Sequence, residues 1–195
     1  MWRPAAIMAL LVTVLGACSS TPDAPAGIVR DPAPVVGTET LPDVSDGGAD
    51  FPFVAGPDRV LVVYFGYTSC PDVCPTTLAD LRRALEDLGR RADDVDVAMA
   101  TIDPGRDTDE VLTGYLTSFV PEGHPLRTTD DTELRAAADA FGADYRVGTD
   151  EDGEVEVEHT GFLYAVDDEG RLRLTWPFGT EWQTIEGDLR WLLEQ

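Results

Sequence analysis

A continuous apolar run at residues 60–65, followed within ten residues by two cysteines and a helical pattern, is the feature that most limits the folds open to this chain. The run reads Val-Leu-Val-Val-Tyr-Phe. Because it is continuous rather than alternating, it predicts a strand covered on both faces, as in the centre of a parallel sheet. Four leucines then recur at spacings of three and four: Leu78, Leu81, Leu85 and Leu88. They predict a helix from Pro75 to about Arg91, since proline suits a first helical turn.

The rest of the pattern predicts one α/β domain over residues 36–195. Further strands are expected at residues 95–102, 144–147, 155–159, 161–166 and 172–176. Further helices are expected at residues 108–119 and 132–141 and at the C-terminus, where Thr180 would be the cap. A strand–helix–strand opening and a closing hairpin with a helix describe a thioredoxin-like fold, a central mixed sheet flanked by helices. Residues 38–44 and 51–54 predict an added N-terminal β-hairpin around a glycine turn.

Residues 1–17 predict a targeting signal rather than part of the fold. Arg3 is followed by an apolar run at residues 5–17, which is shorter than the roughly 20 residues of a membrane-spanning helix. Leu-Gly-Ala-Cys at residues 15–18 resembles the bacterial lipobox, in which the cysteine is acylated; a plain secretory signal is the alternative. Residues 18–35 are rich in proline and predict a flexible tether. We therefore expect an extracytoplasmic domain, anchored to the cell membrane through a lipid on Cys18.

The charge of the chain excludes several functional classes. Lys plus Arg total 14 and Asp plus Glu total 37, which leaves a net charge of −23. A field of that sign repels phosphate backbones, so we expect no nucleic-acid partner. All the basic residues except histidine are arginines, so a lysine nucleophile is excluded.

Two cysteines, Cys70 and Cys74, lie between the buried strand and the predicted helix. Three intervening residues put their sulfurs about one helical turn apart on the same side. The pair can therefore share one soft metal ion or close a small disulfide. We expect the helix start to lower the thiol pKa and so raise the thiolate fraction. An inert structural disulfide is the alternative, although so short a loop removes little chain entropy.

The chain has two histidines, and they have different contexts. His124 is expected to be a solvated loop residue. His159 ends a predicted strand, where alternation puts it on one face with Val155 and Val157. A lone histidine at a strand end is more often a packed residue than a ligand, so this segment alone leaves its role open. Two thiolates with one imidazole would suit copper, because soft ligands favour Cu(I) and imidazole helps to retain Cu(II).

Three segments together resemble the Sco (SenC) family of copper proteins. Residues 65–75, FGYTSCPDVCP, resemble its metal-binding segment; residues 101–108, TIDPGRDT, resemble its second signature; and residues 158–160 with 162–167 resemble its histidine segment. The resemblance spans residues 36–195. It implies a thioredoxin-like fold, one copper ion, Cu(I) or Cu(II), held by Cys70, Cys74 and His159, and a role in cytochrome c oxidase assembly. Glu158 departs from the family, which commonly has Asp before the histidine.

Two functions fit these residues. A copper chaperone would deliver the metal to the CuA centre of oxidase subunit II and would perform no turnover of its own. A thiol–disulfide oxidoreductase would instead use Cys70 and Cys74 as a redox-active catalytic pair to reduce the CuA-ligand cysteines of that subunit. Other copper chaperones or thiol reductants would be further partners. The CxxxC spacing and the absence of proline from residues 150–163 favour the chaperone.

The second signature contains two aspartates, Asp103 and Asp107. We expect them to cap and orient the helix that follows the strand at residues 95–102.

Overall fold

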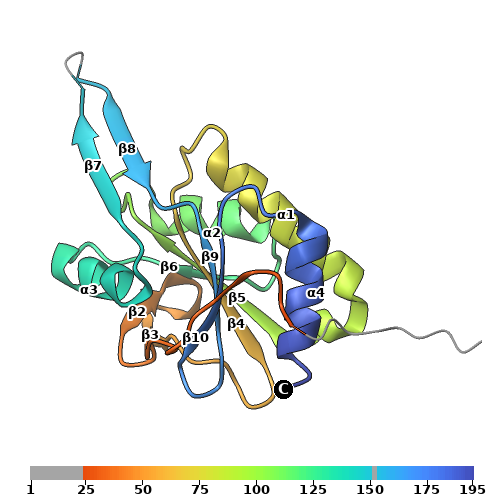
Figure 1. Cartoon of the computed structure of the whole chain (residues 1–195). Helices are drawn as coiled ribbons and strands as arrows, with labels where there is room; N and C mark the ends of the chain where they lie inside the picture. Colours follow the sequence, from red (N-terminus) through yellow and green to blue (C-terminus); the bar gives the residue numbers. More distant parts are fainter. Residues whose placement is uncertain (1–23, 151–152) are drawn as a thin grey trace, which may run out of the picture.

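The computed structural model describes residues 24–150 and 153–195, and its centre is a mixed eight-stranded sheet (Figure 1). The strand order is β1-β10-β9-β4-β5-β6-β2-β3. The two central strands, β4 (Val60–Gly66) and β5 (Val95–Thr101), run parallel. The other strands are β1 (Ile28–Val29), β2 (Thr40–Asp43), β3 (Ala49–Pro52), β6 (His124–Leu126), β9 (Leu163–Val166) and β10 (Leu172–Trp176). Every residue of β4 is buried, which confirms the central strand predicted from its continuous apolar run.

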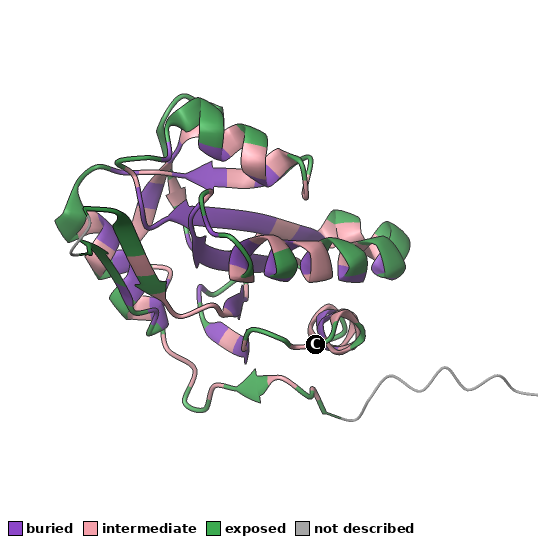
Figure 2. Ribbon diagram, turned by 90° about the horizontal axis from the view of Figure 1, so that it is seen from above, coloured by how far each residue is buried: buried purple, intermediate pink, exposed green. Residues whose placement is uncertain are grey.

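Helices cover both faces of this sheet. They are α1 (Val73–Leu88), α2 (Asp109–Thr117), α3 (Asp131–Phe141) and α4 (Trp182–Leu192), with short 3-10 turns at Val44–Asp46 and Gly89–Asp94. Figure 1 shows α1 and α4 together on one side of the sheet and α3 on the other. Leu78 and Leu81 of α1 are fully buried, as the leucine spacing predicts. In Figure 2 the buried residues gather on the central strands and on the helix faces that meet them.

The side chains of β4 divide the core into two halves. Phe65 packs against Phe141 of α3, with ring centroids 5.3 Å apart, and Phe141 in turn packs against Tyr164 of β9 at the same centroid distance. Tyr64 points to the opposite face because side chains alternate along a strand. That face is covered by α1, so one strand supports the aromatic core and the start of the cysteine-bearing helix.

A separate hairpin carries His159. Strands β7 (Tyr145–Thr149) and β8 (Val155–His159) pair only with each other and project from the body of the molecule (Figure 1). Their register pairs Tyr145 with His159, and directly opposed residues share one face of a hairpin. His159 therefore lies at the base of the hairpin, where β8 returns to the sheet.

The N-terminal segment differs from expectation. Ala26 and Gly27 donate their backbone N–H groups to the Asp188 carboxylate, at 2.7 and 2.8 Å, and β1 pairs with β10. Residues 26–29 are thus fixed to the sheet edge rather than being part of a flexible tether. The reason is Asp188, a buried carboxylate on α4 that needs hydrogen-bond donors and also accepts from Nε1 of Trp176 at 2.8 Å.

The predicted signal at residues 1–17 and the predicted acylation site Cys18 lie outside the described residues. Within the described part of the chain, no helix is both long enough and apolar enough to span a membrane.

The predicted N-terminal hairpin is confirmed, because β2 and β3 pair with each other. Strand β2 also pairs with β6, so the hairpin extends the central sheet. Strand β6 was not expected, because its three residues are too few to show a period. Thr180 does not cap the last helix; its hydroxyl donates to the carbonyl of Pro177 at 2.8 Å, and α4 begins after Glu181.

Candidate metal centre

Cys70, Cys74 and His159 converge at one end of the central sheet. Cys70 lies in the turn after β4, Cys74 in the first turn of α1, and His159 at the end of β8. Their ligand atoms all lie within 4.8 Å of one another, and Cys74 Sγ is 3.6 Å from His159 Nε2. Among the described residues they are the only group of three His, Cys, Asp or Glu side chains placed to hold one metal ion.

The turn that carries Cys70 depends on close packing beneath it. A Cβ atom on Gly66 would lie 2.5 Å from Cε1 of Tyr64 and 3.2 Å from Sγ of Cys74, so only glycine fits there without displacement of the ring. The backbone N–H of Cys74 then donates to Cys70 Sγ at 3.2 Å. A backbone amide in the first turn of α1 therefore donates a hydrogen bond to the sulfur of Cys70, which precedes the helix.

The pKa of the buried Cys74 thiol shifts in the opposite direction to the one expected from the sequence. Its side chain has no exposed surface, whereas Cys70 is 8% exposed. Burial raises the pKa of Cys74 to about 12, although contacts with Tyr64 and Tyr67 act in the opposite direction. The prediction that the helix start lowers the thiol pKa is wrong for Cys74, because desolvation of the thiolate outweighs the effect of the helix start. In the metal-free protein Cys74 is therefore a neutral thiol at pH 7.

The imidazole of His159 is held in its neutral form by its surroundings. Burial lowers its pKa, while backbone groups of Thr160 and Phe65 oppose that shift. The ring of Tyr67 meets it edge-on at 5.7 Å between centroids, and the ring of Tyr64 does so at 6.2 Å. A neutral imidazole is the form that binds metals. Sequence reasoning missed both tyrosines, whose only signal was their position beside the cysteine segment.

The donor set fits a soft metal ion. It consists of two sulfurs and one imidazole nitrogen. Thiolates favour Cu(I) and Zn²⁺, whereas Mg²⁺ and Ca²⁺ prefer carboxylate and carbonyl oxygens. The largest separation, 4.8 Å, is close to twice a metal–sulfur bond of about 2.3 Å. A single ion can therefore contact all three atoms after a small adjustment.

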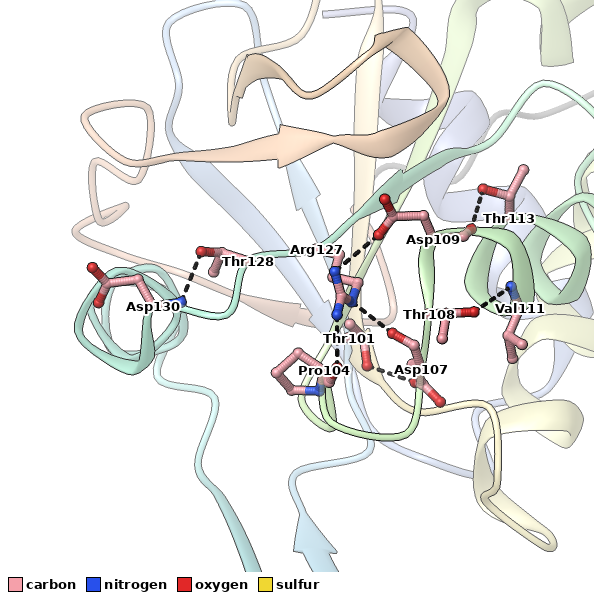
Figure 3. A network of polar contacts seen from close by, with 10 residues as sticks. All are labelled: Thr101, Pro104, Asp107, Thr108, Asp109, Val111, Thr113, Arg127, Thr128 and Asp130. Carbon is pink, nitrogen blue, oxygen red and sulfur yellow. Dashed lines mark hydrogen bonds and ion pairs between the residues drawn. The ribbon is translucent and has the colours of Figure 1, made fainter.

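The two aspartates of the second signature do not cap the next helix. Thr108 does so, accepting from Val111 N at 3.3 Å (Figure 3). Asp103 forms an ion pair with Arg106. The carboxylate of Asp107 is directed to the cysteine segment, where it accepts hydrogen bonds from the backbone and hydroxyl of Thr68. The two residues are 39 positions apart, so no local pattern could have shown this contact.

His124 is not the solvated loop residue expected from the sequence. It begins β6, and its Nδ1 lies 2.8 Å from Oδ2 of the buried Asp43. Its ring also contacts Phe51, at 4.6 Å between centroids. Both contacts tie β6 to the N-terminal hairpin, so His124 has a structural role here and is not part of the three-residue group.

Comparison with known sequences gives a consistent result. The SCO1/SenC family profile matches residues 55–194. The SCO2-like protein of Rickettsia prowazekii is 38% identical over 112 residues, which cover 56% of this chain and 54% of that protein. Protein SenC of Rhodobacter capsulatus is 34% identical over 106 residues, or 54% of this chain and 48% of that protein. The chain thus spans about half the length of the curated relatives it matches.

Solved structures resemble the whole domain. ScoI of Bradyrhizobium japonicum, solved with copper bound, has a TM-score of 0.67 and 28% identity, covering 79% of this chain and 96% of that one. Apo Sco1 of Thermus thermophilus has a TM-score of 0.63 and 31% identity, covering 82% and 98%. These matches confirm the thioredoxin-like α/β fold predicted from the order of the elements.

Proposed function

This chain belongs to the SCO1/SenC family, and we propose that it binds one copper ion through Cys70, Cys74 and His159 and delivers it to the CuA centre of cytochrome c oxidase subunit II. The observation that carries the proposal is the convergence of these three donors within 4.8 Å. The copper-bound relative from Bradyrhizobium japonicum supports the choice of metal.

The burial of the donors suits transfer rather than permanent storage. Cys74 is fully buried, Cys70 retains 8% of its surface, and His159 is half-buried. A ligand from an acceptor protein can therefore approach the metal from the side of Cys70 and His159. The bond between the metal and Cys74 would then be the last to break. Two thiolates suffice for low-coordinate Cu(I), whereas Cu(II) favours the additional imidazole.

A second function rests on a different property of the same cysteines. Both are free thiols in the structure. In this alternative Cys70, the more exposed sulfur, attacks a disulfide between the CuA-ligand cysteines of subunit II and forms a mixed disulfide. Cys74 then attacks Cys70 Sγ, which closes the Cys70–Cys74 disulfide and releases the target as two thiols. The cycle consumes two electrons, which an external thiol reductant would return.

Our proposal places this site outside the cytoplasm, anchored by a lipid on Cys18. The support is the sequence alone, a short apolar run that ends in Leu-Gly-Ala-Cys. Because residues 26–29 are held on the sheet edge, only the residues between Cys18 and Ala26 would separate the domain from the membrane surface.

The chain's two histidines provide a matched test of the two functions. We expect His159→Ala to weaken Cu(II) binding far more than Cu(I) binding, to abolish CuA assembly under copper limitation and to leave thiol–disulfide exchange intact. His124→Ala, which alters the other histidine, should leave copper binding and delivery unchanged. Normal oxidase activity in the His159→Ala strain under copper limitation would reject delivery and favour reduction.

A further inference from the structure

Asp107 is a fully buried carboxylate in the loop between β5 and α2. It accepts hydrogen bonds from the backbone N–H of Thr68 at 3.0 Å, from the Thr68 hydroxyl at 2.6 Å and from the Thr101 hydroxyl at 2.6 Å. These three donors are neutral groups. Burying a carboxylate is costly unless its oxygens are hydrogen-bonded, so these contacts fix both the carboxylate and the donors.

The donors that Asp107 holds belong to the cysteine segment. Thr68 lies two residues before Cys70, inside a turn in which Cys70 N donates to the carbonyl of Tyr67 at 3.4 Å. The neighbouring Arg106 places its guanidinium over the ring of Tyr67, 5.9 Å from the centroid. The loop after β5 thus contacts two successive residues of the turn that precedes Cys70.

The loop itself is held from the other side by one arginine (Figure 3). Arg127, which follows β6, donates through Nε to the backbone carbonyl of Asp107 at 2.6 Å and through Nη2 to that of Pro104 at 2.9 Å. Its Nη1 also pairs with the Asp109 carboxylate at 2.9 Å. A continuous set of contacts therefore runs from β6 through Asp107 to Thr68.

Cys70 is the donor that depends on such support. Cys74 is held by α1 and His159 by β8, but Cys70 lies outside any helix or strand. We propose that Asp107 is a positioning residue, which acts through Thr68 to keep Cys70 Sγ where it can share one copper ion with Cys74 and His159. The inference rests on the proposed copper site. Hydrogen bonds behind a metal's ligands commonly determine ligand orientation in this way.

Single substitutions in the full chain separate positioning from general stability. Thr68→Val removes the hydroxyl and keeps both the shape and the backbone N–H, whereas Thr68→Ser keeps the hydroxyl. Asp107→Asn neutralises the acceptor. Thr128→Val is the matched control, because Thr128 is a buried residue whose hydroxyl accepts from Asp130 N at 3.1 Å, at the start of α3 instead of at the cysteines (Figure 3).

Two readouts are measured: copper affinity by competition with a chelator, and the equilibrium constant for Cys70–Cys74 disulfide formation against glutathione in the metal-free protein. We expect Thr68→Val and Asp107→Asn to lower copper affinity by about 10- to 100-fold, the usual range for groups behind metal ligands. A loosened Cys70 also meets Cys74 less often, so the disulfide equilibrium constant should fall by about threefold or more. Thr68→Ser and Thr128→Val should remain close to the wild type in both.

Wild-type values for Thr68→Val in both measurements would overturn the inference. The inference would also be overturned if Thr128→Val lowered copper affinity and the disulfide equilibrium constant as much as Thr68→Val does. If Asp107→Asn does not fold, the three threonine variants decide the question. If the wild type itself takes up no copper, the proposed function fails. The disulfide equilibrium of the metal-free protein then decides by itself whether Asp107 positions Cys70.

Discussion

The sulfur of Cys74 lies 3.6 Å from Nε2 of His159, although the two residues are 85 positions apart in the chain. One belongs to the first turn of a helix and the other to the end of a hairpin strand outside the main sheet. The contact brings a second type of donor to a pair of cysteines that would otherwise be a dithiol. A simple dithiol redox pair would not need this imidazole, whereas the proposed metal site would use it as a third ligand.

Copper binding should release a proton from Cys74. Because burial raises the pKa of this thiol to about 12, it is protonated throughout the neutral range. Metal binding requires the thiolate, so this one group should make apparent copper affinity rise by about tenfold for each pH unit between pH 7 and pH 9. Calorimetry in buffers of different ionisation enthalpy should detect the released proton. Copper binding that neither releases protons nor depends on pH would contradict the assignment of Cys74 as a ligand.

Acid should destabilise the N-terminal hairpin through Asp43. Burial raises the pKa of this carboxyl, but hydrogen bonds from Ser45 and His124 outweigh burial and leave it below its usual value of 3.8. A carboxyl whose pKa is lowered by folding stabilises the protein at pH values above its pKa in the unfolded chain. That contribution is lost as the pH falls through its pKa in the folded protein. Urea unfolding should therefore show that wild type loses more stability than Asp43→Asn below about pH 4. Equal acid sensitivity in the two proteins would remove this role.

Gly66 should tolerate no side chain. A Cβ atom there would lie 2.5 Å from the Tyr64 ring and 3.2 Å from Cys74 Sγ. We expect Gly66→Ala to cost about 1–3 kcal/mol of unfolding free energy, as overpacked cores do, and to weaken copper binding. Gly114→Ala in α2 is the control, because its added methyl would meet no atom within 4 Å and should be neutral or stabilising. Thermal unfolding and chelator competition on both variants provide the comparison.

Asp188 should hold the N-terminal segment on the domain. Asp188→Ala would leave two backbone amides and the Trp176 indole N–H without their acceptor. The expected cost is about 1–3 kcal/mol, together with faster amide exchange at residues 26–29. Glu194→Ala, which removes the partly exposed ion pair with Arg91, should change stability by no more than about 1 kcal/mol. Hydrogen exchange that stays slow at residues 26–29 in Asp188→Ala would argue against this contact.

Membrane attachment should depend on Cys18. If that cysteine is acylated, Cys18→Ser should either release the protein from membranes or leave it with an uncut signal segment. Fractionation of cells, with the molecular mass of the product, distinguishes these outcomes from the wild type. Processing and membrane attachment that are unchanged in Cys18→Ser would reject the lipid anchor, and they would leave the copper site untouched.

Much of the architecture follows from local sequence patterns. The apolar run at residues 60–65 specified a central strand because every side chain in it needs an apolar neighbour on either face. The leucine spacing specified α1 because residues three and four apart lie on one face of a helix. The CxxxC spacing likewise determined that two sulfurs would lie near each other at the start of that helix.

Only the tertiary structure decided how those sulfurs behave and what surrounds them. Desolvation reversed the expected direction of the Cys74 pKa shift, and desolvation depends on every atom packed around the thiol. His159 reaches Cys74, and Asp107 reaches Thr68, through contacts between residues far apart in the chain. Residues 26–29 bind the sheet edge because Asp188 lies buried beside them. Local periodicity records which face of an element is apolar, but it contains no information on which distant side chain the fold will place against it.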